Sequence, residues 1–152
     1  GAFEAFLAMP DGWAENKINA CLGLSQALTV LGEHEQAKRA LLRSFALEVP
    51  RSAVCCALAA LEYADNRARQ AVFWYETAIR AASTAPYGFI DVNACAYAPA
   101  LGLCVCWDKL GDPKQACAWN ERAALVRPQS AAVAHNRRYF AAQGLTAEPP
   151  SA

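Results

Sequence analysis

Seven cysteines are the residues of this chain most capable of chemistry, and three of them lie close together in the sequence. Cys104, Cys106 and Cys117 fall within LGLCVCWDKLGDPKQACAWNERAALVRP, residues 101–128. Thiols so close to one another could hold a metal, form a redox pair or pack as small apolar groups. The spacing of the cysteines decides among these possibilities.

The cysteine pairs do not have the spacing of a zinc site. Structural zinc sites commonly use C-x2-C or H-x3-5-H pairs, whereas this chain has the adjacent Cys55 and Cys56 and the C-x-C of Cys104 and Cys106. On a helix, the members of such pairs point about 100° and about 200° apart. We therefore expect reduced, buried thiols without a metal, in a reducing compartment such as the cytoplasm.

Other catalytic motifs are missing from the sequence. His34 and His135 lie about a hundred residues apart, and neither has a cysteine or carboxylate at catalytic spacing. The phosphate-binding patterns G-x-x-x-x-G-K-[ST] and G-x-G-x-x-G do not occur. We expect no enzymatic activity, no cofactor and no metal from this chain.

Composition favours one soluble domain. Of 152 residues, 55% are hydrophobic, which is enough for a sizeable core. The 14 basic and 14 acidic residues balance, so nucleic acid and membrane surfaces are not expected partners. No apolar run approaches the roughly 20 residues that cross a bilayer. The chain opens on Gly-Ala, and we expect it to be part of a longer protein.

A repeat organises the sequence. The stretch LTVLGEHEQAKRALLRSFAL aligns with EYADNRARQAVFWYETAIRA and with WDKLGDPKQACAWNERAALV. The matching alanines of the three copies are Ala37, Ala71 and Ala116. The step from the first to the second is one period of about 34 residues, typical of the helix-turn-helix of tetratricopeptide (TPR) repeats. The step from the second to the third is longer than one period, so the chain has an insertion there.

The repeats predict an all-α fold, a right-handed α-α superhelix of about three TPR-like helix pairs plus a C-terminal capping helix. A further helix is expected in AFEAFLAM, residues 2–9, as the end of an earlier unit. The expected single domain spans 1–144, with repeats at about 18–50, 52–83 and 97–128, a capping helix at about 130–143 and a disordered tail over 145–152.

Local signals support these boundaries. Gly111 can end the first helix of the third repeat in a left-handed conformation, and Asn66 can do the same in the second. Asp112 and Pro113 then begin the next helix, and Ser130 can cap the last one. Cys104, Ala59 and Ser25 occupy equivalent positions in the three repeats, where a small buried residue is expected.

Two segments resemble the TPR-like region C-terminal to the catalytic domain of bacterial family 2 glycosyltransferases. They are PRSAVCCALAALEYADNRARQAVFWYETAI, residues 50–79, and residues 88–140, which include PALGLCVCWDKLGD and the closing NRRYF. The family implies a metal and a nucleotide sugar held by an Asp-x-Asp motif on an α/β domain. This chain has no Asp-x-Asp motif and no alternation of strands and helices. Its segment AALEYADNR also lacks the aromatic-Leu-Gly pattern that is usual in the second repeat.

The first helices of the repeats should line a concave groove, through their second, fifth, ninth, twelfth and thirteenth positions. A groove that is mostly small and apolar argues against gripping a peptide's terminal carboxylate. It favours contact with a partner protein or peptide, or with a neighbouring domain. The candidate partner-binding residues, on the groove and the crossover loop, are Asn19, Leu22, Gln26, Cys56, Ala60, Tyr63, Leu101, Val105, Asp108, Lys109, Tyr87 and Phe89.

The insertion falls in ASTAPYGFIDVNACAYAP, residues 82–99. This segment is either an extended helix with an ordered crossover or a loop that covers the groove or contacts a partner. Two functions follow: a non-catalytic interaction or scaffold module, part of a family 2 glycosyltransferase, or an accessory domain that completes the acceptor site of that enzyme.

Overall fold

The computed structural model describes residue 2 and residues 14–82 and 93–146, and these contain helices and no strand. The predicted all-α class is therefore confirmed. The chain divides into two compact units, Gly1–Pro50 and Arg51–Ala152. No helix in the described ranges is long and apolar enough to cross a membrane. The helix expected at residues 2–9 lies almost entirely outside the described residues.

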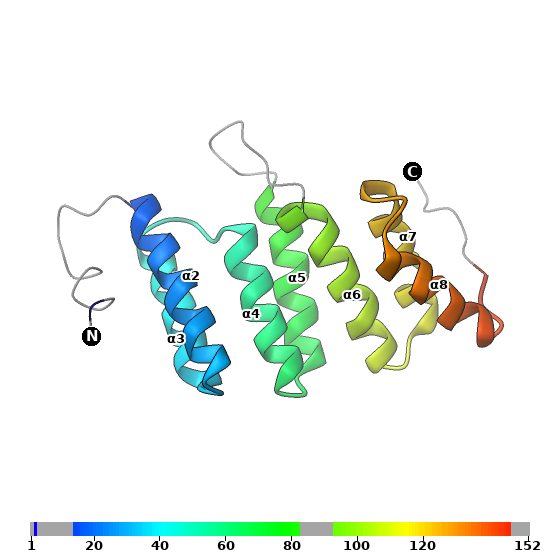
Figure 1. Ribbon diagram of the computed structural model, residues 1–152, viewed down its shortest axis with the longest axis horizontal. Coiled ribbons are helices and arrows are strands. Elements are labelled where there is room, and N and C mark those ends of the chain that lie inside the picture. Colours follow the sequence, from blue (N-terminus) through cyan, green and yellow to red (C-terminus); the bar gives the residue numbers. More distant parts are fainter. Residues whose placement is uncertain (1, 3–13, 83–92, 147–152) are drawn as a thin grey trace. The chain divides into compact units, whose positions relative to one another are not determined.

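The described residues of the first unit form one helix pair, α2 and α3, followed by a short 3-10 turn, η1 (Figure 1). Their bounds are Ala14–Val30, His34–Arg43 and Ser44–Ala46. The two α-helices contact each other, and the apolar side chains of Ile18 and Leu41 are buried. The helix α2 begins before residue 18, the expected start of the first repeat.

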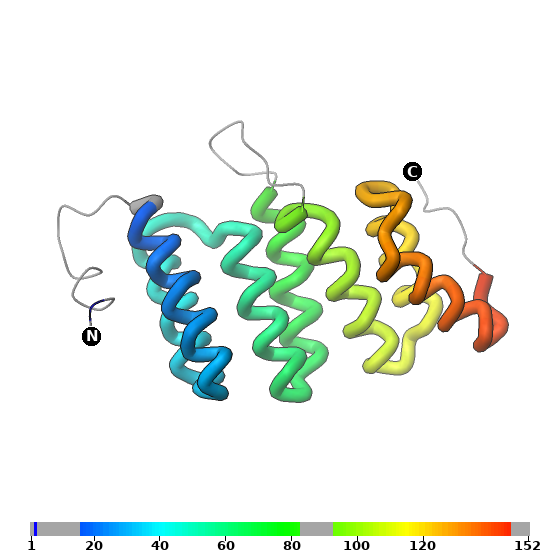
Figure 2. The backbone as a smooth tube through the Cα atoms, viewed as in Figure 1, coloured from blue at the N-terminus to red at the C-terminus, as the bar shows by residue number. Residues whose placement is uncertain are grey.

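The described residues of the second unit form two complete helix pairs, one further α-helix and a π-helix. Successive α-helices of this unit run antiparallel to one another, which Figure 2 shows along the backbone. The bounds are α4 Ser52–Ala64, α5 Ala68–Ala82, π-helix η2 Asn93–Tyr97, α6 Ala98–Lys109, α7 Pro113–Val126 and α8 Ala131–Ala142. We call the first helix of each pair an A helix (α2, α4, α6) and the second a B helix (α3, α5, α7).

All three A helices, and also α8, end in the same way. The second residue past each helix has a positive φ, which favours glycine or asparagine. In each case the next backbone N–H donates to a carbonyl five residues earlier, at 2.9 Å. The helix α8 therefore has the end and the register of a fourth A helix. The terminating residues are Gly32 (φ 78°), Asn66 (φ 63°), Gly111 (φ 84°) and Gly144 (φ 80°).

Side-chain caps begin the last two helices as expected. The backbone N–H of Gln115 donates to the Asp112 carboxylate at 3.1 Å, and Pro113 is the first residue of α7. The backbone N–H of Val133 donates to Ser130 Oγ at 3.2 Å at the start of α8. Each cap satisfies one of the N–H groups that a helix start leaves without a partner.

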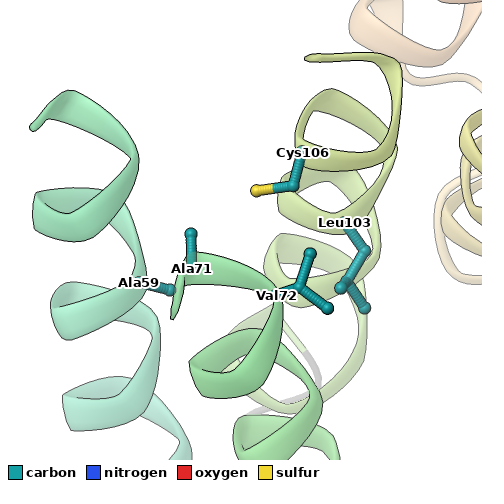
Figure 3. Close-up of a cluster of buried hydrophobic side chains, with 5 residues drawn as sticks. All are labelled: Ala59, Ala71, Val72, Leu103 and Cys106. Atoms are coloured by element: carbon teal, nitrogen blue, oxygen red, sulfur yellow. The ribbon is translucent and has the colours of Figure 1, made fainter. Parts of the chain in front are cut away.

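A buried cluster joins α4, α5 and α6 (Figure 3). Small side chains on the facing helices allow the backbones to approach, and the larger Leu103 fills the remaining space. The N-terminal end of α4 is also tied to α5, because Ser52 Oγ donates to the Ala78 carbonyl at 2.6 Å. The members of the cluster are Ala59, Ala71, Val72, Leu103 and Cys106.

The π-helix η2 precedes Pro99 of α6. Proline has no N–H, and its ring conflicts with the carbonyl four residues earlier, here that of Cys95, so a regular α-turn is disfavoured at this point. A wider π-turn is one way for the helix to accommodate the proline. The described end of the 82–99 crossover is thus helical, and residues 83–92 lie outside the described residues.

The contact between α7 and α8 includes polar side chains as well as apolar ones. Asn120, which is fully buried, donates from Nδ2 to the Val133 carbonyl at 3.2 Å. Asn136 Nδ2 donates to Asn120 Oδ1 at 3.0 Å. At the edge of the contact, Arg137 donates two hydrogen bonds to the Glu121 carboxylate, at 2.9 and 2.6 Å. Directional bonds therefore fix how α8 lies on the array.

Candidate functional site: the A-helix face of the second unit

The A helices of the second unit present the predicted binding positions to solvent. On α4, Ala60 and Tyr63 are exposed and Cys56 is half-buried, with its thiol donating to the Ala94 carbonyl at 3.4 Å. On α6, Val105 and Lys109 are exposed. The two helices contact each other, so these positions lie on neighbouring elements. We call this surface of α4, α6 and α8 the A-helix face.

Two other predicted residues of α6 are half-buried. Leu101 packs against the cluster of Ala100, Ala123, Ala124 and Val133 and so contributes mainly to the core. Asp108 accepts a hydrogen bond from Tyr139 Oη at 2.9 Å. Leu101 can therefore offer only part of its side chain to a partner, and Asp108 is already engaged.

The helix α8 also contributes to this face, which the sequence interpretation missed. Arg138 stands six positions before the terminator Gly144, as Val105 does before Gly111 and Ala60 before Asn66. Arg138 is exposed, and its neighbour Tyr139 is 45% exposed. The signal was available in the sequence, because Gly144 repeats the spacing of the other terminators.

A second missed residue comes from a B helix. A Cβ at Gly102 of α6 would overlap the Tyr75 ring, so the ring of this α5 residue rests directly on the Gly102 backbone. Burial raises the pKa of Tyr75, with smaller contributions from Cys106, Cys56 and Tyr63. Tyr75 therefore lies between α4 and α6, and only glycine at position 102 leaves room for it.

The remaining predicted site residues lie on the first unit or outside the described residues. Asn19 and Gln26 are exposed and Leu22 is half-buried, and all three lie on α2 of the first unit. Tyr87 and Phe89 lie outside the described residues, so the proposed cover over the groove stays a prediction.

Three buried thiols, those of Cys55, Cys104 and Cys106, lie in surroundings that suppress their reactivity. Burial is the main cause that raises the pKa of Cys104 to about 12, with lesser contributions from Asp108 and the thiols of Cys117 and Cys106. Burial also raises the pKa of Cys55 and of Cys106 to about 11. A thiol must lose its proton to attack or to bind a metal, so these groups behave as small apolar side chains at neutral pH.

A cavity of about 700 Å³ opens beside the turn between α7 and α8, lined by Tyr97 and residues 127–132. The Arg127 guanidinium lies 4.5 Å from the centroid of the Tyr97 ring, and Tyr97 Oη is 2.6 Å from Ser130 Oγ. Arg127, Tyr97 and Ser130 thus already interact with one another. Among the described residues, no group of three or more His, Cys, Asp or Glu side chains could hold a metal here or elsewhere.

The A helices end at glycine or asparagine, and the paired helices pack through small side chains. These features define a TPR-like helical-repeat protein, as the spacing of the repeats predicted. The crystal structure of MamA is similar, with a TM-score of 0.72 and 14% sequence identity, over 95% of this chain and 76% of that one. At that identity the likeness shows the fold alone. No protein-family model matches the chain, and no curated protein gives a significant match.

Proposed function

We propose that this chain is a non-catalytic protein-interaction module whose partner binds the A-helix face of the second unit. The observation that carries the proposal is a series of exposed apolar side chains on successive helices of this face. Tyr63 on α4 is 36% exposed, Val105 on α6 is 42% exposed and Tyr139 on α8 is 45% exposed. Apolar groups gathered on one surface commonly mark a site of protein contact.

Small residues around these side chains suit the approach of a partner backbone. Ala53 and Ala60 of α4 are exposed, and Ala134 of α8 is half-buried. A helix or extended segment of a partner could therefore place its own large side chains between Tyr63, Val105 and Tyr139. The described residues of this face include no nucleophile paired with a base, which supports binding rather than catalysis.

A matched pair of variants tests the binding surface. Val105→Glu should abolish partner capture, because it places a charge in the middle of the face, whereas Leu125→Glu should not. Leu125 is 71% exposed on the B helix α7, so both changes put a glutamate at an exposed apolar position of the same unit. Cross-linking of the tagged protein in its host, followed by mass spectrometry, would identify partners that depend on Val105. Equal capture by the two variants would overturn the proposal.

We also propose that the module belongs to a family 2 glycosyltransferase. The support is the resemblance of residues 50–79 and 88–140 to the TPR-like region of those enzymes. Sequencing the complete gene tests this, since an upstream α/β domain with an Asp-x-Asp motif is expected. Calorimetry of the isolated chain with nucleotide sugars and Mn²⁺ should show no binding, because the chain has no Asp-x-Asp pair. A micromolar response would contradict the non-catalytic assignment.

A further inference from the structure

The two ends of the A-helix face differ in charge. The α4 end presents Ala53, Ala60, Tyr63 and Ala64, and the single carboxylate of this helix, Glu62, is buried and paired with Arg67 at 3.0 Å. The α8 end presents Arg138, and the sequence of α8 contains no aspartate or glutamate. Between the two ends lies Val105 on α6. The face therefore changes from apolar to cationic from α4 to α8.

The exposed cations of α6 and α8 on this face are available to a partner. Across the described ranges, Arg138 and Lys109 take part in no salt bridge, whereas Arg137 is paired with Glu121. Asp108 is the one carboxylate at the described groove positions of α6 and α8, and it is half-buried and accepts the Tyr139 hydroxyl. Two exposed cations beside one engaged carboxylate leave an excess of positive charge.

We infer that the A-helix face binds a partner segment in one orientation, with a carboxylate-rich end on α8 and an apolar end over α4. This inference rests on the proposed function. Charge complementarity determines the acidic end, and the exposed Val105 and Tyr63 determine the apolar end. A protein segment fits better than nucleic acid, because the chain has no net positive charge and apolar groups lie among the cations.

Two synthetic fluorescent peptides of one design test the inference on the full chain. The first has four apolar residues followed by four Glu residues, and the second has Lys in place of every Glu. The Glu peptide should bind, and its affinity should fall between about 50 mM and about 300 mM salt as the charges are screened. The Lys peptide should bind at least about tenfold more weakly.

Charge-reversed variants locate the acidic end. Arg138→Glu should weaken the Glu peptide about fivefold at low salt and less at high salt. Arg69→Glu serves as the matched control, because Arg69 is an exposed cation on the B helix α5, and it should leave the affinity unchanged. A photo-cross-linker at the apolar end of the peptide should label α4, and one at the acidic end should label α8.

Several outcomes would overturn the inference: no binding of the Glu peptide, equal binding of the Lys peptide, equal effects of Arg138→Glu and Arg69→Glu, or reversed cross-links. An RNA oligonucleotide that bound more tightly than the Glu peptide and lost affinity in Arg138→Glu would overturn it too. If binding depended on Val105 but not on Arg138, the orientation would be wrong and the proposed function would stand. If Val105→Glu kept its partner, the proposed function itself would fail.

Discussion

The α4–α5 contact and the α7–α8 contact hold their helices together in different ways. Between α4 and α5, the alanines at positions 59 and 71 are fully buried and let the two helices approach closely. Between α7 and α8, the buried Asn120 donates to the Val133 carbonyl, and the Glu121–Arg137 pair lies at the edge of the contact. Apolar contacts are non-directional, whereas hydrogen bonds require one geometry. The last helix is therefore held in a defined position, while the inner pair depends on close packing.

The largest loss of stability should follow from removing the apolar part of the contact that α8 makes. Phe140→Ala should lower the free energy of unfolding by about 4 kcal/mol, because the ring is 2% exposed and packs against the Cys104 and Cys117 cluster. Tyr139→Ala, at the exposed neighbouring position, should cost less than about 1 kcal/mol. Urea unfolding measures both. Equal losses would mean that α8 is not held by its buried ring.

The second-largest loss of stability should come from adding a methyl group where α6 packs closely against α5. Gly102→Ala should cost about 3 kcal/mol, because its methyl group would overlap the Tyr75 ring. Tyr75→Ala is also destabilising, but in that background the added methyl group has room. The double variant should therefore lose less than the sum of the two single losses in thermal or urea melts. Additive losses would show that the clash is absent.

Breaking the buried amide network should have an intermediate effect. Asn120→Ala should cost about 2 kcal/mol, since it leaves the Asn136 amide without its acceptor and removes the donor to the Val133 carbonyl. A double-mutant cycle with Asn136→Ala should give a coupling energy of about 1 kcal/mol. If the cycle showed no coupling, the polar description of the α7–α8 contact would be wrong.

The buried thiols should make stability depend on alkaline pH. The folded protein raises the pKa of Cys104 to about 12 from an ordinary value of 9.0, so the unfolded chain releases the proton first. The stabilisation is fully present below about pH 9 and is lost as the pH rises toward about 12. Each thiol of this kind contributes at most about 1.4 kcal/mol per pH unit.

Urea melts at several pH values above about 9 measure this slope, and Cys104→Ala should make it shallower. If Cys104→Ala kept the wild-type dependence of stability on pH, a group other than the Cys104 thiol would be responsible for it. His135→Ala, which changes an exposed residue of α8 and leaves every thiol in place, serves as the control.

The smallest effect belongs to the ion pair at the edge of the α7–α8 contact. Arg137→Ala should cost about 0.5 to 1 kcal/mol, because its side chain is 45% exposed and solvent screens the pair. The loss should shrink in high salt, whereas that of Asn120→Ala should not. If Arg137→Ala lost as much stability as Asn120→Ala, or if its loss did not change with salt, the ion pair would contribute as a buried interaction does and not as a solvent-screened one.

Short-range chemistry made much of the fold predictable. The left-handed ends at Asn66 and Gly111 and the cap at Asp112 depend on residues within one turn, so the sequence indicates them directly. Tyr75 and Gly102 lie on different helices, far apart in the sequence, and no local pattern links them. The candidate site was predictable to a similar degree: α4 and α6 follow from the period and the Gly144 spacing marks α8, whereas the contacts that hold α8 beside α6 and α7 are not local.

The position of Arg137 bears on how such an array could grow. It stands seven positions before Gly144, where the three A helices have the small buried residues Ser25, Ala59 and Cys104 before their own terminators. A B helix added after Gly144 would need a small residue there for close packing. Close packing of a B helix against this side of α8 therefore requires an exchange at position 137, and the same exchange would release Glu121 to pair elsewhere.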